Sequence, residues 1–159
     1  MTSVFRTPRR LYGLLALGEM ITWTLLLTGM AGKYLLRLGE AGDLAVRIGG
    51  SIHGFVFLAY CLVTVLVTVD QRWRARDLLL GLASAIVPYA TVPFERSADR
   101  RGLLSDRWRL RGHQPRGPHE TAVAAALRRP VLAGAMALVG VGVAFSVLLA
   151  AGPPTQWFN

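Results

Sequence analysis

Four apolar stretches, separated by polar segments, divide the chain. They occupy residues 11–32, 48–69, 78–94 and 130–152. About 20 predominantly apolar residues are enough for a helix to cross the roughly 30 Å hydrocarbon core of a bilayer. The first, second and fourth stretches meet this length, whereas the third is shorter and is interrupted by Pro88 and Pro93. The pattern therefore predicts an all-α integral membrane bundle of four transmembrane helices, with the third span kinked at Pro88 and Pro93.

The first two stretches differ in how readily they would enter a membrane. Residues 48–69 hold twelve Leu, Ile, Val or Phe, which contribute roughly −4 to −7 kcal/mol to insertion. Residues 11–32 hold eight and contribute about −2 to −5 kcal/mol, against a cost near +3 kcal/mol if Glu19 behaves like Asp. We expect this first span to need helix partners or a protonated Glu19. Since Glu19 also interrupts the run where a signal peptide should be free of charge, we expect an uncleaved helix.

The polar segments complete the expected organisation. Residues 1–105 are predicted to form a three-span membrane core and residues 106–129 an Arg-rich loop, irregular at its centre. Residues 130–152 are predicted to form the fourth transmembrane helix, followed by a tail over residues 153–159. Trp73, Trp108 and Trp157 flank the spans, and we expect them to be interfacial anchors.

The distribution of basic residues predicts an orientation. With four spans, residues 33–47 and 95–129 lie on one side with twelve basic residues, against six on the other. The positive-inside rule then places the Arg-rich loop 95–129 in the cytoplasm and both termini outside. If the third stretch were re-entrant, the N-terminal tail and both later loops would share one side, with fifteen basic residues against three. Because re-entrant backbone must be buried in protein or line water, we expect four spans.

Composition narrows the class of protein. The 159 residues are 53% hydrophobic and 17% charged, with a net charge of +9 and a mean hydropathy of +0.42. These values exclude a disordered chain and are too apolar for a soluble domain. A single Cys excludes a disulfide scaffold, and Cys61, within an apolar stretch, is most simply a packed thiol. We expect a multi-pass protein of the cell (plasma) membrane.

A series of short motifs runs through the first three stretches. The motifs are Gly18-Glu19 with Trp23, Gly29-Met30-x-x-Lys33-Tyr34, His53-Gly54 with Phe57-x-x-Tyr60, Ala83-Ser84-x-x-x-Pro88-x-x-Thr91, Phe94-Glu95-Arg96 and Arg100-Arg101-Gly102-Leu103-Leu104. Together they resemble the bacterial membrane family called domain of unknown function 3817, over about residues 8–105. That family is usually a three-span unit, so the stretch 130–152 would be an addition to it. The resemblance implies an architecture and supplies no activity.

Two ionisable residues within the apolar stretches are the main candidates for chemistry. Glu19 could relay a proton or cation or contact a partner, because buried carboxylates in membranes are costly, but it could equally be a packing residue. His53 could contact a quinone or haem, although a neutral imidazole bonded to a neighbouring helix is the simpler interpretation. Aligning the ends of the two apolar runs separates their depths by about 12 Å, so we do not expect them to pair. Lys33 and Tyr89 are further intramembrane polar candidates.

Small residues and arginines supply the remaining candidates. Small residues at four-residue spacing predict helix-packing faces at Gly50 and Gly54, Gly81 and Ala85, and Ala133 and Ala137. Contacts with anionic phospholipids or with a partner are expected at Arg96, Arg100, Arg101, Arg107, Arg109 and Arg111. Nucleic acid is not expected, because only Trp108 offers a stacking platform. His113, His119 and Glu120 do not form a recognised ligand pattern, so we expect no metal and no cofactor.

These features predict a noncatalytic accessory or assembly subunit of a larger bacterial membrane complex. The partners would be other membrane-protein subunits, and the Arg-rich, Lys-poor composition suggests an actinobacterial respiratory (electron-transport) assembly. One alternative is a small homo-oligomeric transporter or channel that uses Glu19. The other is a quinone- or haem-contacting subunit that uses His53. No nucleophile, base and electrophile come together in the sequence, so an enzyme is not expected.

Overall fold

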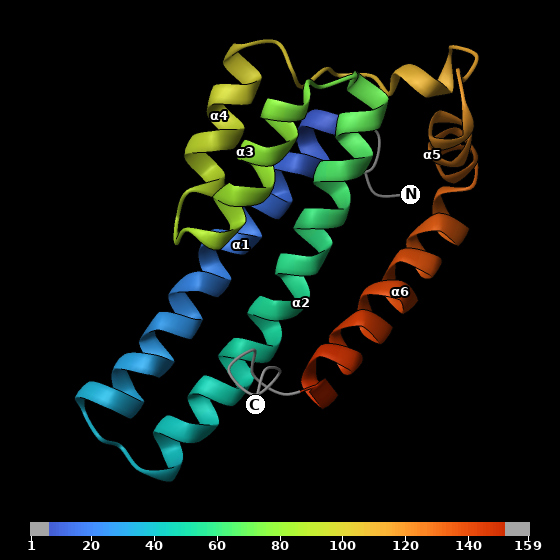
Figure 1. Ribbon diagram of the computed structural model, residues 1–159. Helices are drawn as coiled ribbons and strands as arrows, with labels where there is room; N and C mark the ends of the chain where they lie inside the picture. The colour runs from blue at the N-terminus through green and yellow to red at the C-terminus, as the bar shows by residue number, and fades with distance from the viewer. Residues whose placement is uncertain (1–6, 152–159) are drawn as a thin grey trace.

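The computed structural model describes residues 7–151, so Arg6, Trp157 and the expected tail 153–159 lie outside the described residues. All regular structure in the described range is helical (Figure 1). The elements are α1 (Pro8–Met30), the π-helical turn η2 (Ala31–Leu35), α2 (Glu40–Gln71), α3 (Ala75–Ile86), α4 (Thr91–Arg100), the 3₁₀ turn η3 (Arg109–Arg111), α5 (Pro118–Arg128) and α6 (Pro130–Ala151).

The α1–α2 hairpin forms the centre of the molecule. Thr7 caps α1, since its hydroxyl oxygen accepts a hydrogen bond from Arg10 N at 3.2 Å. Glycines allow the two helices to approach closely near their connection: a Cβ at Gly42 would lie 2.8 Å from the Lys33 Cα, and one at Gly49 would lie 3.1 Å from the Leu25 carbonyl oxygen. Both helices extend beyond their apolar runs, which leaves only residues 36–39 as the connection.

The third apolar stretch is a helical hairpin and not a kinked span. Helix α3 ends at Ile86, and Val87, the residue before Pro88, is extended at φ −94° and ψ 122°. A proline disfavours the helical conformation in the residue that precedes it, so Pro88 ends the helix. Pro93 falls in the first turn of α4, where a missing N–H is tolerated. At 12 and 10 residues, α3 and α4 are about 18 and 15 Å long, which is half of a bilayer core.

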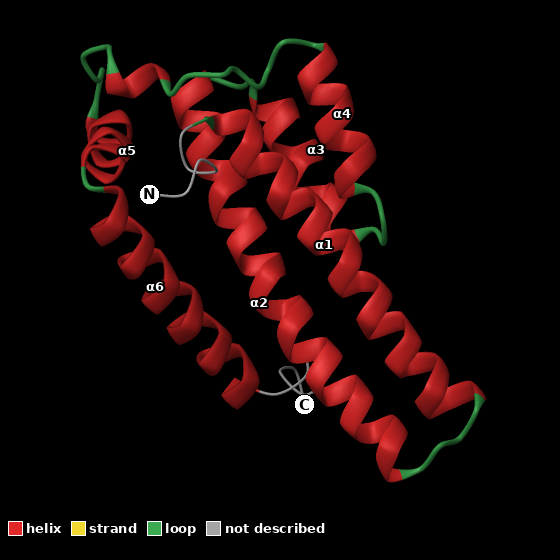
Figure 2. Ribbon diagram, turned by 180° about the vertical axis from the view of Figure 1, so that it is seen from behind, coloured by secondary structure: helices red, strands yellow, loops and turns green. Residues whose placement is uncertain are grey.

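Three helices of the described chain are long and apolar enough to cross a membrane: Pro8–Leu35, Glu40–Gln71 and Pro130–Leu148. The expected third span over residues 78–94 is therefore replaced by the α3–α4 hairpin. Figures 1 and 2 show this hairpin beside only the half of α1 and α2 that is nearest to the start of α1 and the end of α2. This is the arrangement of the re-entrant alternative, in which the chain enters and leaves at the same end.

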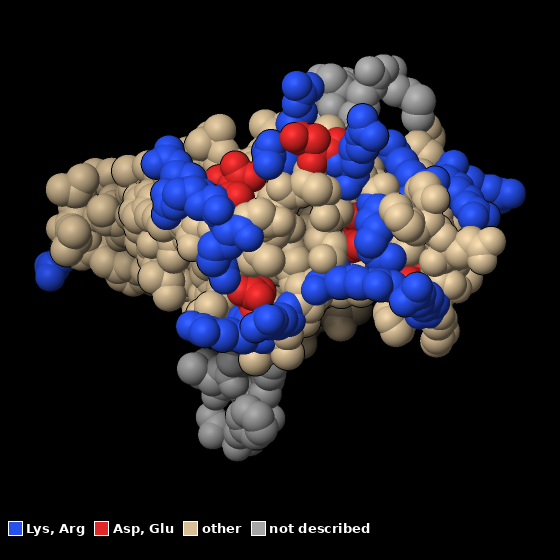
Figure 3. Space-filling view, turned by 90° about the horizontal axis from the view of Figure 1, so that it is seen from above, with Lys and Arg blue, Asp and Glu red and all other residues tan. Residues whose placement is uncertain are grey.

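One end of the bundle consequently gathers most of the basic residues. The start of α1, the end of α2, the end of α4 and helix α5 all lie there, whereas the connection 36–39 lies at the opposite end (Figure 1). We call this end the basic end. Viewed along the bundle from above, it shows Lys and Arg side chains surrounding a few acidic ones (Figure 3). Of the basic residues that the structure describes, fourteen fall in the segments of this end, against three in residues 33–47.

Aromatic residues form the core below the basic end. Trp73 is 7% exposed and Trp108 is 4% exposed, so the expectation that they are interfacial anchors is wrong. Trp73 packs edge-on against Tyr12 and Phe94, at ring-centroid distances of 5.6 and 6.0 Å. Its indole nitrogen donates a hydrogen bond to the Leu103 carbonyl oxygen at 2.8 Å, which satisfies its one polar group inside the protein.

Candidate functional site

A buried glutamate and a buried histidine meet in the middle of the α1–α2 hairpin. Nδ1 of His53 lies 3.1 Å from Oε2 of Glu19. Glu19 is completely buried, and His53 is 8% exposed. Neither Glu19 oxygen has a hydrogen-bond partner among the described residues. The two ionisable groups therefore lie close together while the hydrogen-bonding capacity of the carboxyl group is left unsatisfied. Such groups inside membrane proteins commonly belong to ion or proton pathways.

The expectation that these two residues lie at different depths is wrong. It aligned the ends of the apolar runs at residues 32 and 48, whereas η2 continues to Leu35 and α2 begins at Glu40. Measured from the centre of the connection 36–39, Glu19 and His53 are about 18 and 15 residues away. A difference of about three residues is less than one helical turn, so the two side chains reach the same level.

The neighbours of His53 indicate where its proton lies. The Thr22 hydroxyl donates to the Glu19 carbonyl oxygen at 3.1 Å, and its oxygen lies 3.2 Å from Nδ1 of His53. Because that hydroxyl proton is already donated, its oxygen is free to accept, which favours a proton on Nδ1. The Trp23 ring lies 4.4 Å from the imidazole centroid and the Phe57 ring 6.3 Å from it. An Nδ1–H that faces a carboxylate can hold a proton or pass it on. Among the described residues, no group of three His, Cys, Asp or Glu side chains could hold a metal ion.

A chain of buried hydroxyl groups joins the α3–α4 hairpin to the α1–α2 hairpin. The Tyr12 and Tyr60 hydroxyl oxygens are 2.7 Å apart, and the Tyr60 hydroxyl oxygen is 3.0 Å from Ser84 Oγ. Thr64 Oγ1 contacts the Tyr12 hydroxyl at 3.4 Å, and a Cβ at Gly81 would lie 2.9 Å from the Thr64 methyl group. The sequence analysis did not anticipate this chain, although Tyr60 and Ser84 occur in two of its motifs.

Two further hydrogen bonds hold the hairpin at its far end. Thr91 Oγ1 donates to the Ala16 carbonyl oxygen at 2.9 Å, and Trp23 Nε1 donates to the Ala85 carbonyl oxygen at 3.2 Å. The second bond satisfies one of the carbonyl groups that the end of α3 leaves without a helical partner. The predicted packing residues Gly81 and Ala85 thus lie on the face of α3 that contacts α1 and α2.

The Arg-rich loop is ordered around two buried carboxylates that the sequence analysis did not single out as anchors. Asp70 Oδ2 and Oδ1 accept hydrogen bonds from Arg109 N and Leu110 N, both at 3.0 Å. Glu120 Oε1 accepts from Arg109 Nη2 at 2.8 Å and from Arg72 Nε at 3.1 Å. The loop centre is irregular, as expected, apart from the short turn η3. It is nevertheless held in place, because Asp70 and Glu120 dock η3 and the start of α5 onto the end of α2.

Glu120 is the clearest titrating group outside the helices of spanning length. Its pKa is lowered from 4.5 to about 2, first by the hydrogen bond from the Arg116 backbone N–H to Oε2 and then by the guanidinium groups of Arg109 and Arg72. The carboxylate is therefore charged at every physiological pH. It acts as a fixed anion that holds together the end of α2, η3 and the segment before α5.

Other ion pairs fasten the basic end. Arg9, at the start of α1, pairs with Asp99 at 2.6 Å and with Asp106 at 2.9 Å. Arg101 Nη1 lies 2.6 Å from Asp77 Oδ1, which ties the end of α4 to the start of α3. Of the arginines predicted to meet lipid or a partner, Arg101 and Arg109 are thus engaged within the chain. Arg96, Arg100, Arg107 and Arg111 are exposed.

The remaining predicted residues are dispersed. Lys33 pairs with Asp43 at 2.9 Å, near the connection 36–39. Tyr89 lies in the turn between α3 and α4, with a φ of 65°, and its hydroxyl lies 3.4 Å from Thr24 Oγ1. A Cβ at Gly50 would lie 3.7 Å from a Leu26 methyl group, and one at Gly54 would lie 2.9 Å from the Phe145 ring of α6. Ala133 and Ala137 line cavities beside α6.

These observations define the class: a helical membrane protein with three helices of spanning length, a short helical hairpin and a buried Glu–His pair. The chain belongs to the family described as Domain of unknown function (DUF3817), whose model matches residues 9–100. The match ends with α4, so α5 and α6 lie beyond the family unit.

Two relatives agree with this class. The chain is 40% identical over 96 residues to SCO5905 of Streptomyces coelicolor, whose name describes it as a membrane protein; the match covers 60% of this chain and 11% of that protein. It is 35% identical over 72 residues to the uncharacterized membrane protein YdzA of Bacillus subtilis; this match covers 45% of the chain and 71% of YdzA. The chain thus spans only about a tenth of the length of the Streptomyces relative. No solved structure matches the chain significantly.

Proposed function

We propose that the protein is a noncatalytic accessory or assembly subunit of a larger membrane complex. The observation that carries this proposal is the exposed turn of the α3–α4 hairpin, residues 86–89, which we call the hairpin tip. Ile86 is 68% exposed, Val87 56% and Tyr89 43%. The tip lies about 18 Å along α3 from the basic end, near the middle of a bilayer core.

Irregular backbone is not stable against lipid at this depth. Polar backbone groups outside a helix find no water in the hydrocarbon region, so such turns occur only where protein covers them or where they line a water-filled cavity. In the monomer the hairpin tip faces outward with apolar side chains. The apolar side chains of the tip are better suited to contact with another protein than to lining a water-filled cavity. This supports association with another membrane subunit. A respiratory complex is one such partner.

We also propose that the basic end faces the cytoplasm of the cell membrane. Fourteen of the described basic residues fall in the segments of this end, against three in residues 33–47. The positive-inside rule favours the side with this excess for the cytoplasm. The start of α1 would then lie inside and the end of α6 outside.

Crosslinking from the hairpin tip tests the association. A photoreactive phenylalanine analogue at Val87 should give adducts with a different membrane protein in native membranes, and native mass spectrometry in mild detergent should show a hetero-complex. The matched control is the same analogue at Val139 on α6, which is 64% exposed and about 14 Å from the start of α6. Lipid adducts alone at both positions, together with a monomer in the mass spectrum, would contradict the proposal.

The buried Glu19–His53 pair supports a second candidate, a small homo-oligomeric transporter or channel for protons or cations. Adducts between two copies of this chain at Val87 would favour it over an accessory role. In liposomes, Glu19→Gln should then abolish the proton flux of the purified protein, whereas Glu40→Gln, at an exposed carboxyl group, should leave it unchanged. Flux that is equal in both variants would exclude a role for Glu19. A haem or quinone contact at His53 stays a prediction.

A further inference from the structure

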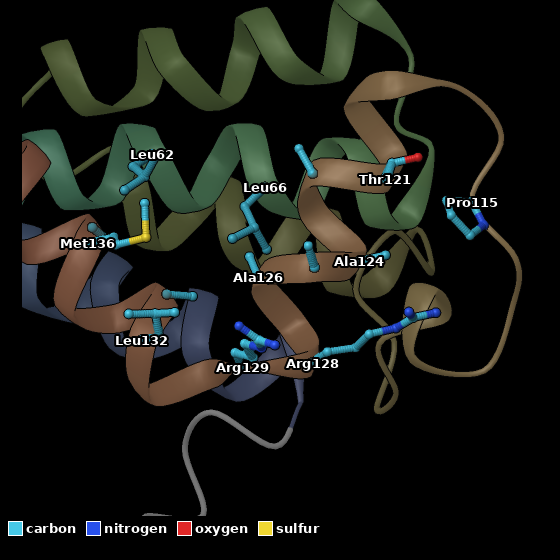
Figure 4. A pocket seen from close by; sticks show the side chains of 14 residues that line it. Leu62, Leu66, Pro115, Thr121, Ala124, Ala126, Arg128, Arg129, Leu132 and Met136 are labelled. Atoms are coloured by element: carbon cyan, nitrogen blue, oxygen red, sulfur yellow. The ribbon is translucent and has the colours of Figure 1, made fainter.

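An apolar groove separates α6 from the α1–α2 hairpin. Its larger part is a cavity of about 750 Å³ at the bend between α5 and α6, between Leu62 and Leu66 of α2 and Leu132 and Met136 of α6 (Figure 4). A second cavity of about 290 Å³ lies against α1 and shares Leu62 and Leu66 with the first. Both volumes are of the order of small-molecule sites, which are typically about 300–1,000 Å³.

The groove has a charged end. Arg128 and Arg129 line the larger cavity where α5 passes into α6, as Figure 4 shows, and Arg111 lines the smaller one. All three side chains are exposed. Arg72, Arg101 and Arg109 form ion pairs with carboxylates, but within the described residues neither Arg128 nor Arg129 lies in such a pair. The charged end of the groove is therefore free to take an anion.

The order of polar and apolar residues along the groove selects the kind of occupant. The arginines belong to the basic end. In a membrane-embedded chain this charged end would lie at the membrane interface, with α6 descending from it towards the hydrocarbon core. From Arg129 to Ala137 the lining continues for about 12 Å with apolar side chains. An occupant must combine an anionic head with an apolar chain of at least this length. A transmembrane helix of a partner does not in general carry an anionic group at its end. Basic pockets between membrane helices, in contrast, commonly bind anionic lipid head groups.

We propose that this groove binds an anionic phospholipid, with the phosphate at Arg128 and Arg129 and one acyl chain between α2 and α6. Guanidinium groups are well suited to phosphate because they donate two parallel hydrogen bonds. The lipid would fill the space between the family unit, residues 9–100, and the additional helix α6. This inference requires a membrane-embedded chain but not the association proposed above.

Lipid retention by the purified full-length chain tests the head-group contact. Native mass spectrometry would follow titration with phosphatidylglycerol and, separately, with phosphatidylcholine. We expect phosphatidylglycerol to bind more tightly, and the double variant Arg128→Gln with Arg129→Gln to weaken its binding at least about tenfold. The charge-matched control is Arg74→Gln with Arg76→Gln at the start of α3, two exposed positions that line neither cavity, and it should leave the affinity within about twofold. Equal binding of the two lipids, or equal losses in both double variants, would overturn the proposal.

A second pair of variants tests the acyl chain without changing charge. Ala133→Phe fills the groove, because Ala133 lines both cavities, whereas Ala135→Phe adds the same ring to an exposed position of α6 that lines neither. We expect Ala133→Phe to lose the retained lipid and Ala135→Phe to keep it, with equal thermal melting of both variants. Retention by Ala133→Phe, or equally tight binding of glycerol phosphate without acyl chains, would overturn the assignment. If a photoreactive group at Met136 labelled protein and not lipid in native membranes, the occupant of the groove would be a partner helix and the lipid assignment would be overturned.

Discussion

At the residue scale, buried hydroxyl groups connect three helices of the bundle. Tyr60 is fully buried and lies within hydrogen-bonding distance of both the Tyr12 hydroxyl and Ser84 Oγ. It therefore joins α1, α2 and α3 through a single atom. Inside a membrane protein such bonds have no competing water, and the polar groups that they satisfy would be costly to leave unpaired.

Replacing Tyr60 by Phe should therefore destabilise the protein. We expect Tyr60→Phe to lower the free energy of unfolding in detergent by about 1–3 kcal/mol, because two buried hydroxyl groups lose a partner at once. Tyr34→Phe is the matched control, since Tyr34 is 61% exposed and the change should stay within about 0.5 kcal/mol. Equal effects in denaturant titrations of the two variants would show that the Tyr60 hydroxyl contributes nothing.

The Glu19–His53 pair shows at the same scale what the sequence could and could not predict. Each residue is recognisable alone, because an ionisable side chain in an apolar run is unusual. Their contact depends on where the two helices end, and α2 begins at Glu40, eight residues before the apolar run that starts at residue 48. An error of a few residues in the position of each helix end shifts the expected partner along the neighbouring helix by more than one helical turn.

At the scale of elements, a buried carboxylate holds the start of helix α5 in place. Glu120 receives hydrogen bonds from Arg72, Arg109 and the Arg116 backbone. Because its pKa is about 2 in the folded protein and 4.5 ordinarily, the unfolded chain binds more protons between these two values. This stabilisation is fully present above about pH 4.5 and is lost as the pH falls towards 2.

Thermal melting as a function of pH checks this dependence. The wild-type melting temperature should fall between pH 4.5 and 2, and Glu120→Gln should have a lower melting temperature at pH 7 and a shallower fall over that range. Glu40→Gln changes the net charge equally at an exposed position of the opposite end and should keep the wild-type slope. A slope in Glu120→Gln that is as steep as in the wild type would contradict the role of Glu120.

The α3–α4 hairpin illustrates the limit of apolar length as a predictor of elements. Residues 78–94 are apolar enough to suggest a span, and the sequence correctly identifies Pro88 and Pro93 as an interruption. A proline can kink a helix or end it, and the local sequence does not distinguish these outcomes. Contacts of Thr91 with Ala16 and of Trp23 with Ala85 hold the chain in the reversed direction, and these partners lie more than 60 residues apart.

At the scale of the whole molecule, the number of spans decides which loops share a side of the membrane. A four-span bundle would place the connection 36–39 and the Arg-rich loop on the same side, whereas three spans and a hairpin place them on opposite sides. Leu38 is 54% exposed and Gln114 is exposed, so cysteines at these positions can report the side directly.

Labelling with a membrane-impermeant maleimide distinguishes the two arrangements. In a background that carries Cys61→Ala, we expect Leu38→Cys to react in intact cells and Gln114→Cys to react only after permeabilisation. The reason is that the positive-inside rule places the basic end in the cytoplasm. Reaction of both cysteines from the same side would restore the four-span bundle, and the reverse pattern would invert the proposed orientation.

The class of this protein follows from its sequence alone, because the length and polarity of an apolar run are local properties and they govern insertion into a bilayer. The sequence also located the interruption at Pro88, the two buried ionisable residues and the surplus of arginines. Which residues meet became visible in the folded chain: the Glu19–His53 contact, the hydroxyl chain, the docking of Arg109 on Asp70 and Glu120, and the reversal of α3 into α4. These contacts depend on the register and direction of helices that are distant in the chain. Side-chain contacts between helices set that register and direction, so no single segment of the sequence determines them.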